Sequence, residues 1–238
     1  MRGNLLGTVN AKTSKGEPLG YITGILYLVP SDGSGLGNLC PNASTGCRAA
    51  CLFSAGRGRM QNVKAGRMRK TRLFFENSAK FVDMLSDDIH KLVRECLRED
   101  KLPCVRLNGT SDIPWEWIKG TDGLTIFQKW PNVQFYDYTK RFLRFDRPLP
   151  GNYHLTFSRS EANEYTAESC YGKHNVAVVF NTKKGHELPM WWKGVPVIDA
   201  DQHDLRFLDP QGVICGLRAK GKAKKDKSGF VVDTTIGE

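Results

Sequence analysis

Short runs of apolar residues recur along the chain and predict β-strands. The first run, residues 21–29, is rich in β-branched and aromatic side chains, as expected of a buried strand. Six further runs follow, at residues 104–107, 133–138, 153–157, 175–180, 195–199 and 213–217. Most of them lack the polar alternation of a half-exposed strand, which is typical of strands covered on both faces in a parallel sheet.

Between the first two runs, residues 62–100 change to a helical spacing. Apolar side chains recur there mostly every three or four positions, at Leu73, Phe74, Phe81, Leu85, Ile89, Leu92, Val93 and Leu97. Pro103 ends the helical pattern. Alternating strands and helices are typical of a barrel, a partial barrel or a doubly wound sheet.

The later connecting segments are short, which favours an incomplete (partial) parallel β/α barrel with a cysteine loop after the first strand. We expect one α/β domain over residues 1–238. Its parts are a cysteine loop (30–60), a basic helical segment (61–100), a strand-rich barrel remainder (101–218) and a basic C-terminal segment (218–238).

Polar side chains collect where the expected strands end, and active sites of α/β folds lie at the carboxyl ends of strands. Strand ends are also polar simply because they reach solvent. The candidates for catalysis are Asp112, Lys140 and Arg159. The candidates for cofactor binding are Asn108, Ser111, Tyr138 and Arg141.

The charge of the chain is unevenly distributed. The formal net charge is +10, and residues 48–72 hold eight basic side chains and no acidic one. Residues 218–227 hold six basic side chains against Asp226 alone. Such clusters attract polyanions. A solvated surface is the alternative, but a solvated helix face usually mixes both signs of charge, so we expect an anionic partner. The nucleic-acid-binding candidates are Arg57, Arg59, Lys64, Arg67, Arg69, Lys70 and Arg72.

No stretch approaches the roughly 18 apolar residues of a membrane helix, and the first residues lack the order of a signal peptide. We therefore expect a cytoplasmic protein without a membrane partner, and the oligomeric state stays open. Seven cysteines in a reducing compartment are more often ligands than disulfide partners. Cys104 and Cys215 lie in apolar runs and are expected to be buried.

Three of the cysteines, Cys40, Cys47 and Cys51, fall within twelve residues. Three thiolates leave one position open on a zinc ion or on one iron of a 4Fe-4S cluster. A closed zinc site needs a fourth ligand, but no His precedes His90 and no further Cys precedes Cys96. The spacing favours an iron–sulfur cluster, with Zn and unligated thiols as the alternatives.

Four segments carry a family resemblance: CPNASTGCRAACLFSAGRG, NGTSDIPWE, FYDYTKR and SGFVV after GLRAKGKAKKDK. Together they resemble the phage "gene product 88" family over nearly the whole chain. The resemblance implies a phage protein located in the cytoplasm of the infected host cell.

More distantly, a strand followed by a three-cysteine loop resembles radical S-adenosylmethionine (SAM) enzymes, which implies a 4Fe-4S cluster that binds SAM. The pattern departs from the commonest radical SAM loop. The gaps between the cysteines here are six and three residues rather than three and two, and Ala50 stands where an aromatic residue is usual. Residues 108–112 stand where a glycine-glycine-acidic segment is expected.

Two functions follow from these patterns. One is a radical SAM-like enzyme acting on a nucleotide or nucleic-acid substrate. The other is a metal-stabilised nucleic-acid-binding module without catalysis, in which residues 57–72 contact phosphates. Aromatic side chains that could stack on bases are Trp115, Trp117, Phe127 and Trp130, although core packing is the favoured explanation for them.

Overall fold

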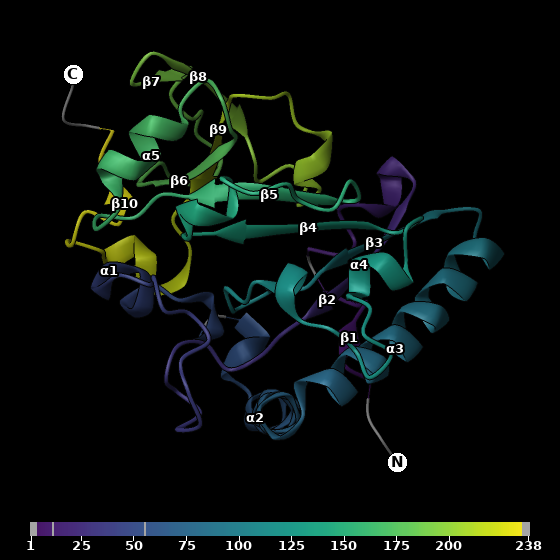
Figure 1. The fold of residues 1–238 in the computed structure, drawn as a ribbon. Helices are drawn as coiled ribbons and strands as arrows, with labels where there is room; N and C mark the ends of the chain where they lie inside the picture. Colours follow the sequence, from purple (N-terminus) through teal and green to yellow (C-terminus); the bar gives the residue numbers. More distant parts are fainter. Residues whose placement is uncertain (1–3, 11, 55, 235–238) are drawn as a thin grey trace.

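The computed structural model describes residues 4–10, 12–54 and 56–234 (Figure 1). Its centre is a sheet of ten strands, most of them parallel, that does not close on itself. Seven parallel strands form the body of the sheet in the spatial order β2, β3, β4, β5, β6, β9 and β8. Their bounds are β2 Tyr21–Leu26, β3 Leu102–Arg106, β4 Gln134–Thr139, β5 Tyr153–Ser158, β6 Val176–Phe180, β8 Val195–Asp199 and β9 Ile214–Arg218.

Each of the seven predicted strands corresponds to one of these parallel strands, so the α/β class is confirmed. Two short strands end the sheet with antiparallel pairs, β1 (Leu6–Gly7) beside β2 and β7 (Trp191–Trp192) beside β8. Because these edges do not meet, a barrel is not confirmed, and a radical SAM-like fold is not shown. The position of β9 between β6 and β8 also breaks the sequential order of a wound barrel.

The helices are α1 Thr45–Ala49, α2 Gln61–Glu76, α3 Ser78–Arg98, α4 Ile126–Lys129 and α5 Glu164–Cys170. The helical pattern predicted over residues 62–100 is confirmed, and it comprises the two helices α2 and α3. The break lies at Asn77, whose backbone is extended at φ −160° and ψ 94°. Its side chain accepts a hydrogen bond from the N–H of Lys80 at 2.9 Å and thereby caps α3.

One face of the sheet is apolar and is covered by α3. Phe81, Leu85 and Ile89 recur on one side of this helix and are at most 1% exposed. Burying each such side chain contributes about 1.5–3 kcal/mol. Gly24 allows the close approach of helix and sheet, because a Cβ there would lie 3.0 Å from Leu6 and 3.1 Å from Leu92.

The opposite face of the sheet is polar. Arg106 on β3 pairs with Asp204 at 2.8 Å, and the guanidinium of Arg106 lies 4.6 Å from the ring of Tyr138 on β4. Burial raises the pKa of Asp204, but Arg106 and Lys12 lower it further, to about 2. A short 3-10 turn, Arg206–Leu208, packs over β4 and β5 on this side. The two faces of one sheet therefore present different chemistry.

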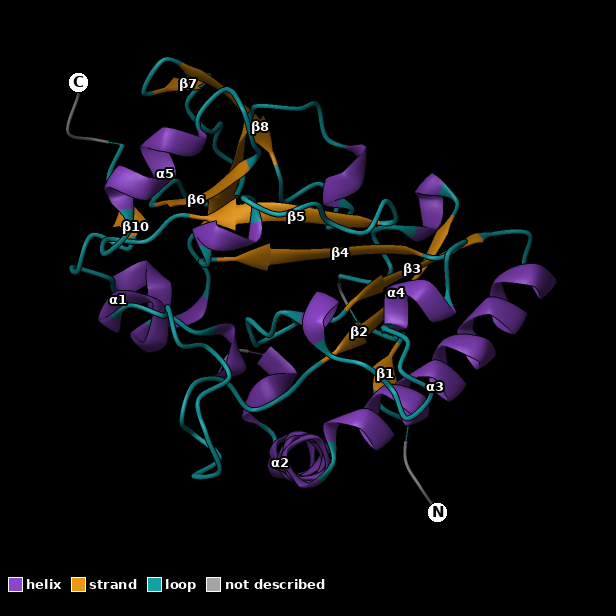
Figure 2. Ribbon diagram, in the orientation of Figure 1, coloured by secondary structure: helices purple, strands orange, loops and turns teal. Residues whose placement is uncertain are grey.

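The carboxyl ends of the strands define the site described below. The arrowheads of β4 and β5 point towards α1 (Figure 2). The strands β5 and β6 pair only at Phe157–Val176 and Ser158–Ala177, and then a short strand, β10 (Val231–Val232), pairs with the remaining length of β6. Residues 226–232, called the C-terminal strap here, thus reach the same end of the sheet as α1.

Candidate metal centre at the carboxyl-end rim

The loop that follows β2 is fixed to the loop that follows β3, and this places Cys40. The backbone N–H of Asp112 donates to the carbonyl of Leu39 at 2.8 Å. The Cys40 thiol lies 3.6 Å from the carbonyl oxygen of Thr110, and the Thr110 hydroxyl donates to the carbonyl of Leu28 at 2.6 Å. These contacts hold Cys40 at the carboxyl ends of β2 and β3.

The short helix α1 carries Cys47, and it is fixed to the end of β5. Ser44 caps the helix by accepting from the N–H of Cys47 at 3.1 Å. Glu161, which follows β5, accepts from the Ser44 hydroxyl and from the N–H of Gly46, both at 2.7 Å. A carboxylate that receives two such bonds holds the helix in one position relative to the sheet.

The C-terminal strap packs tightly against α1. A Cβ on Gly46 would lie 2.8 Å from the Cβ of Phe230 and would overlap the hydroxyl of Ser228, so only glycine fits at this position. Arg159 donates to the carbonyls of Gly229 and Phe230 and also pairs with Glu164. The strap therefore clamps α1 from the side of β10.

The three loop cysteines are half-buried, and burial and neighbouring thiols affect the pKa of Cys40 and of Cys51. Burial raises the pKa of Cys40 to about 12, and Asp112, Cys51 and Cys47 add to the rise, while a backbone N–H of Ser31 opposes it. Burial also raises the pKa of Cys51, and Cys47 adds to that rise. The structure thus brings the three thiols of one loop into a single electrostatic environment.

Two cations from distant elements reach the same place. Arg67 on α2 and Lys140 after β4 both lower the pKa of Cys51, against the larger effect of its burial. The Arg67 guanidinium lies 5.0 Å from the rings of both Tyr27 and Phe53. The Lys140 ammonium donates to the Ser158 hydroxyl at 2.6 Å. A positive environment of this kind suits anionic thiolate ligands.

Within residues 4–10, 12–54 and 56–234, no three Cys, His, Asp or Glu side chains are arranged as ligands of one metal ion. The cysteines outside the loop lie elsewhere in the protein. Cys104 and Cys215 are fully buried, as predicted, and Cys96 and Cys170 are buried as well. Cys40, Cys47 and Cys51 are therefore the three cysteines whose thiols are only half-buried.

Of the three catalytic candidates, Asp112 and Arg159 bond to other parts of the protein, whereas the ammonium of Lys140 is free of carboxylate partners among the described residues. Asp112 accepts hydrogen bonds from the Thr139 hydroxyl at 2.8 Å, the N–H of Lys140 at 2.9 Å and Arg144 at 3.3 Å. It therefore joins the ends of β3 and β4. Arg159 is occupied by the C-terminal strap. The ammonium of Lys140 forms no ion pair with a described residue, and it lies at the cysteine loop.

The cofactor-binding candidates are spread over several environments. Asn108 is 2% exposed and accepts a hydrogen bond from the Ser111 hydroxyl at 2.8 Å, so these two buried side chains stabilise the loop after β3. Tyr138 lies on the polar face against Arg106. The guanidinium of Arg141 lies 5.4 Å from the exposed ring of Trp117. The structure does not bring these four side chains to one point.

Sequence reasoning missed Asp137 and Arg144, two charged groups inside the rim. Burial raises the pKa of Asp137 to about 7, although the N–H of Asn108, Arg106 and the Tyr153 hydroxyl lower it. Arg144 is 1% exposed and donates to Glu116 at 2.7 and 2.8 Å. Nothing in the sequence distinguishes Arg144 from the exposed Arg147. Asp137 lies inside an apolar run, which was an available signal.

The basic candidates separate into outward and inward groups. Arg57, Arg59, Arg69 and Arg72 are exposed, and Lys64 is half-buried. Arg67 faces the cysteine loop. Lys70 donates to the carbonyl of Leu5 at 2.5 Å, and burial lowers its pKa to about 8. In the part of the chain that the structure describes, no helix is long and apolar enough to cross a membrane.

Comparisons with known proteins give one match. Residues 4–234 match the family model described as gene product 88, which confirms the resemblance seen in the sequence. No curated protein and no solved structure matches the chain, and a relation to radical SAM enzymes is not shown.

Proposed function

The chain belongs to the gene product 88 family, and from that premise we propose that it is a phage iron–sulfur protein whose Cys40, Cys47 and Cys51 hold a 4Fe-4S cluster. One observation carries the proposal. Three half-buried thiols from one loop share an electrostatic environment at the carboxyl ends of parallel strands, beside two cations.

The donor set fits a cluster better than a zinc ion. Zinc binds sulfur at about 2.3 Å, so its ligands must converge closely around one point. Each cysteine of a cluster binds a different iron, so the thiols stand farther apart. The described side chains offer no convergent site for a single ion. The support for a shared centre is that the charges of Cys47 and Cys51 raise the pKa of Cys40, and the charge of Cys47 raises that of Cys51.

The surrounding residues have distinct roles in this proposal. Glu161 and the C-terminal strap fix α1 and therefore Cys47, and the loop after β3 fixes Cys40. Arg67 and Lys140 offset the negative charge of thiolate ligands near Cys51. Asp112 and Arg159, the former catalytic candidates, position these elements rather than touch a reacting group.

We further propose a radical SAM-like enzyme acting on a nucleotide or nucleic-acid substrate in the cytoplasm of the infected host cell. When bound, a 4Fe-4S cluster with one open iron supplies electrons and a coordination position for SAM. Lys140 lies at the cysteine loop without a carboxylate partner among the described residues, so it is the candidate to contact substrate or SAM. The open parallel sheet would act as an incomplete barrel.

A second candidate is a metal-stabilised nucleic-acid-binding module without catalysis. The observation that favours it is the exposed surface formed by Arg57, Arg59, Arg69 and Arg72, which pair with no carboxylate of a described residue. Unpaired basic side chains bind phosphates through Coulomb attraction and the release of counterions. This function needs the metal centre only to fix the loop.

The test compares four cysteine variants prepared without oxygen. Wild-type protein should be brown, with broad absorption near ~400 nm from thiolate-ligated iron. Cys40→Ala, Cys47→Ala and Cys51→Ala should each remove the colour and most of the iron. Cys96→Ala is the matched control and should keep both, because Cys96 is buried between α3 and the sheet.

The two candidate functions give different results in a second assay. An enzyme requires exchangeable access to the open iron, so SAM should change the spectrum of the reduced cluster. Colourless wild-type protein that carries one equivalent of zinc would refute the cluster. A coloured protein whose spectrum ignores SAM would favour the binding module.

A further inference from the structure

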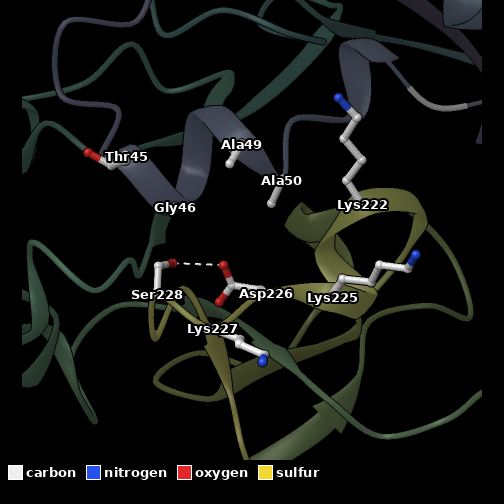
Figure 3. A pocket seen from close by; sticks show the side chains of 9 residues that line it. All are labelled: Thr45, Gly46, Ala49, Ala50, Lys222, Lys225, Asp226, Lys227 and Ser228. Carbon is white, nitrogen blue, oxygen red and sulfur yellow. Dashed lines mark hydrogen bonds between the residues drawn. The ribbon is translucent and has the colours of Figure 1, made fainter.

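A cavity of about 490 Å³ lies between α1 and the Lys-rich turn near the C-terminus (Figure 3). The turn is a 3-10 helix, Gly221–Lys225. The cavity is lined by Thr45, Gly46, Ala49, Ala50, Lys222, Lys225, Asp226, Lys227 and Ser228. Its volume is within the ~300–1,000 Å³ usual for ligand sites. Two segments that are about 175 residues apart in sequence therefore build one concave surface.

The cavity and the thiols use different sides of α1. Gly46, Ala49 and Ala50 line the cavity, whereas Cys47 and Cys51 do not. At 3.6 residues per turn, position 47 lies on another face of α1 from positions 46 and 49, and Cys51 follows the end of the helix. A ligand in the cavity would contact the helix that carries Cys47 without occupying the position of the metal.

The lysines of the cavity form no ion pairs with described residues, so its positive charge is only partly compensated. Lys222, Lys225 and Lys227 are exposed, and none of them forms an ion pair or hydrogen bond with a described residue through its ammonium group. Figure 3 shows that the three lysine side chains extend in different directions from the segment 222–227. Three ammonium groups around a hollow create a strong positive potential.

The single acidic group of the cavity is already engaged. Asp226 accepts from the Ser228 hydroxyl at 2.7 Å and from the N–H of Val231 at 3.0 Å. Burial raises the pKa of Asp226, but these hydrogen bonds lower it further, to a net value below the usual one. The carboxylate therefore stays ionised and offsets one of the three lysine charges, which leaves the lining of the cavity with a net positive charge.

We propose that this cavity binds a phosphate group of a nucleic-acid strand, next to the metal centre. The proposal deepens the proposed function, because it rests on nucleic acid as the ligand and names where the backbone is held. The small side chains of Ala49 and Ala50 leave room for the phosphate, and the lysines supply its counter-charge. Bound strand would then lie against the helix that positions Cys47.

The experiment measures the binding of a fluorescently labelled single-stranded DNA by anisotropy over a range of salt concentrations. The test variant is Lys222→Gln/Lys225→Gln/Lys227→Gln. Its log–log salt slope should be lower than the wild-type slope by up to about 2 units, at about 0.7 per lost phosphate contact. The matched control is Lys80→Gln/Lys119→Gln/Lys173→Gln, which removes the same charge from exposed lysines elsewhere and should keep a slope near wild type.

A second variant separates the cavity from a general positive surface. Ala49→Phe fills the hollow without changing any charge, and Ala49 is exposed enough to accept the ring. It should weaken DNA binding about tenfold, the loss expected for one charge-assisted contact. Unchanged binding by Ala49→Phe, equal slopes for the two triple variants, or no DNA binding by wild type would each overturn the proposal.

Absorption near ~400 nm, recorded on the same samples, keeps the two proposals distinguishable. Colourless protein in which the test variant still has the lower slope refutes the cluster and supports the cavity. Coloured protein in which the two triple variants behave alike supports the cluster and refutes the cavity.

Discussion

The cysteine loop and the loops after β3 and β4 lie at the same end of the sheet, yet their polar groups are used differently. After β3 and β4, the side chains of Asp112, Asn108 and Arg144 are buried. Asp112 accepts hydrogen bonds from Thr139 and Arg144, and Asn108 accepts one from Ser111. In the cysteine loop, the thiols are only half-buried, and their neighbours are the cations Arg67 and Lys140.

The difference shows that polarity at a strand end does not by itself mark a reactive site. A carboxylate such as Asp112, which already accepts three hydrogen bonds, is committed to structure. Soft donors gathered in a positive environment remain available to a ligand. Each experiment below should affect one of these two regions and spare the other.

The largest effect is expected at Arg144. Arg144→Leu removes the partner of Glu116 and Asp112 and should lower the free energy of unfolding by about 3–5 kcal/mol, as when one member of a buried ion pair is lost. Lys140→Leu is the comparison and should cost about 1 kcal/mol or less, because the described partners of its ammonium are uncharged: the Ser158 hydroxyl and carbonyl and the Phe230 ring at 5.6 Å. Urea denaturation measures the free energy of unfolding of both variants. Equal losses of stability would contradict the distinction between a structural Arg144 and an available Lys140.

A pH-dependent effect is expected from Asp137. Its pKa in the folded protein is about 7, above the value of 3.8 for an ordinary aspartate, so folding takes up a proton. The stability is therefore highest below pH ~4, falls as the pH rises and levels off above pH ~7. Between pH 5 and 8 the loss should be about 2–3 kcal/mol.

Asp137→Asn cannot titrate and should lack this part of the pH dependence, whatever its absolute stability. Denaturation curves at several pH values give the comparison. Parallel curves for wild type and Asp137→Asn would show that the carboxyl does not titrate in this range.

A smaller loss of stability is expected when the cap of α1 is removed, and this variant tests whether α1 holds the metal centre. Ser44→Ala removes the cap of α1 and one of the two hydrogen bonds to Glu161, at a cost of about 1 kcal/mol. Since α1 carries Cys47, this variant should also lose iron to a chelator faster than wild type. Thr125→Ala removes the cap of α4 instead and should cost similar stability without faster loss of iron. Equal rates in the two variants would contradict the role given to α1.

The smallest effect on stability is expected from the exposed arginines of α2 and of the 3-10 turn before it, Gly56–Arg59. Replacing Arg57, Arg59, Arg69 and Arg72 by Gln should change the free energy of unfolding by about 0.5 kcal/mol or less, because all four are exposed. If nucleic acid binds there, the salt slope on duplex DNA should fall by up to about 3–4 units. An unchanged slope would assign these residues to an ordinary solvated surface.

Much of the sheet could be predicted because continuous apolar runs with β-branched residues specify buried strands one at a time. The break at Asn77 could not be seen, since Phe74 and Phe81 are seven residues apart and fit one unbroken helix equally well. The cysteine loop was found because its ligands are close in sequence. The roles of Asp112 and Arg159 depend on partners such as Arg144 and Phe230, which only the tertiary structure brings near.

The central claim is that Cys40, Cys47 and Cys51 hold one 4Fe-4S cluster, and elemental analysis tests it most directly. Protein isolated without oxygen should contain about four irons and four acid-labile sulfides per chain, together with absorption near ~400 nm. One zinc per chain without sulfide, or protein with neither metal nor sulfide after reconstitution with iron and sulfide, would contradict the account.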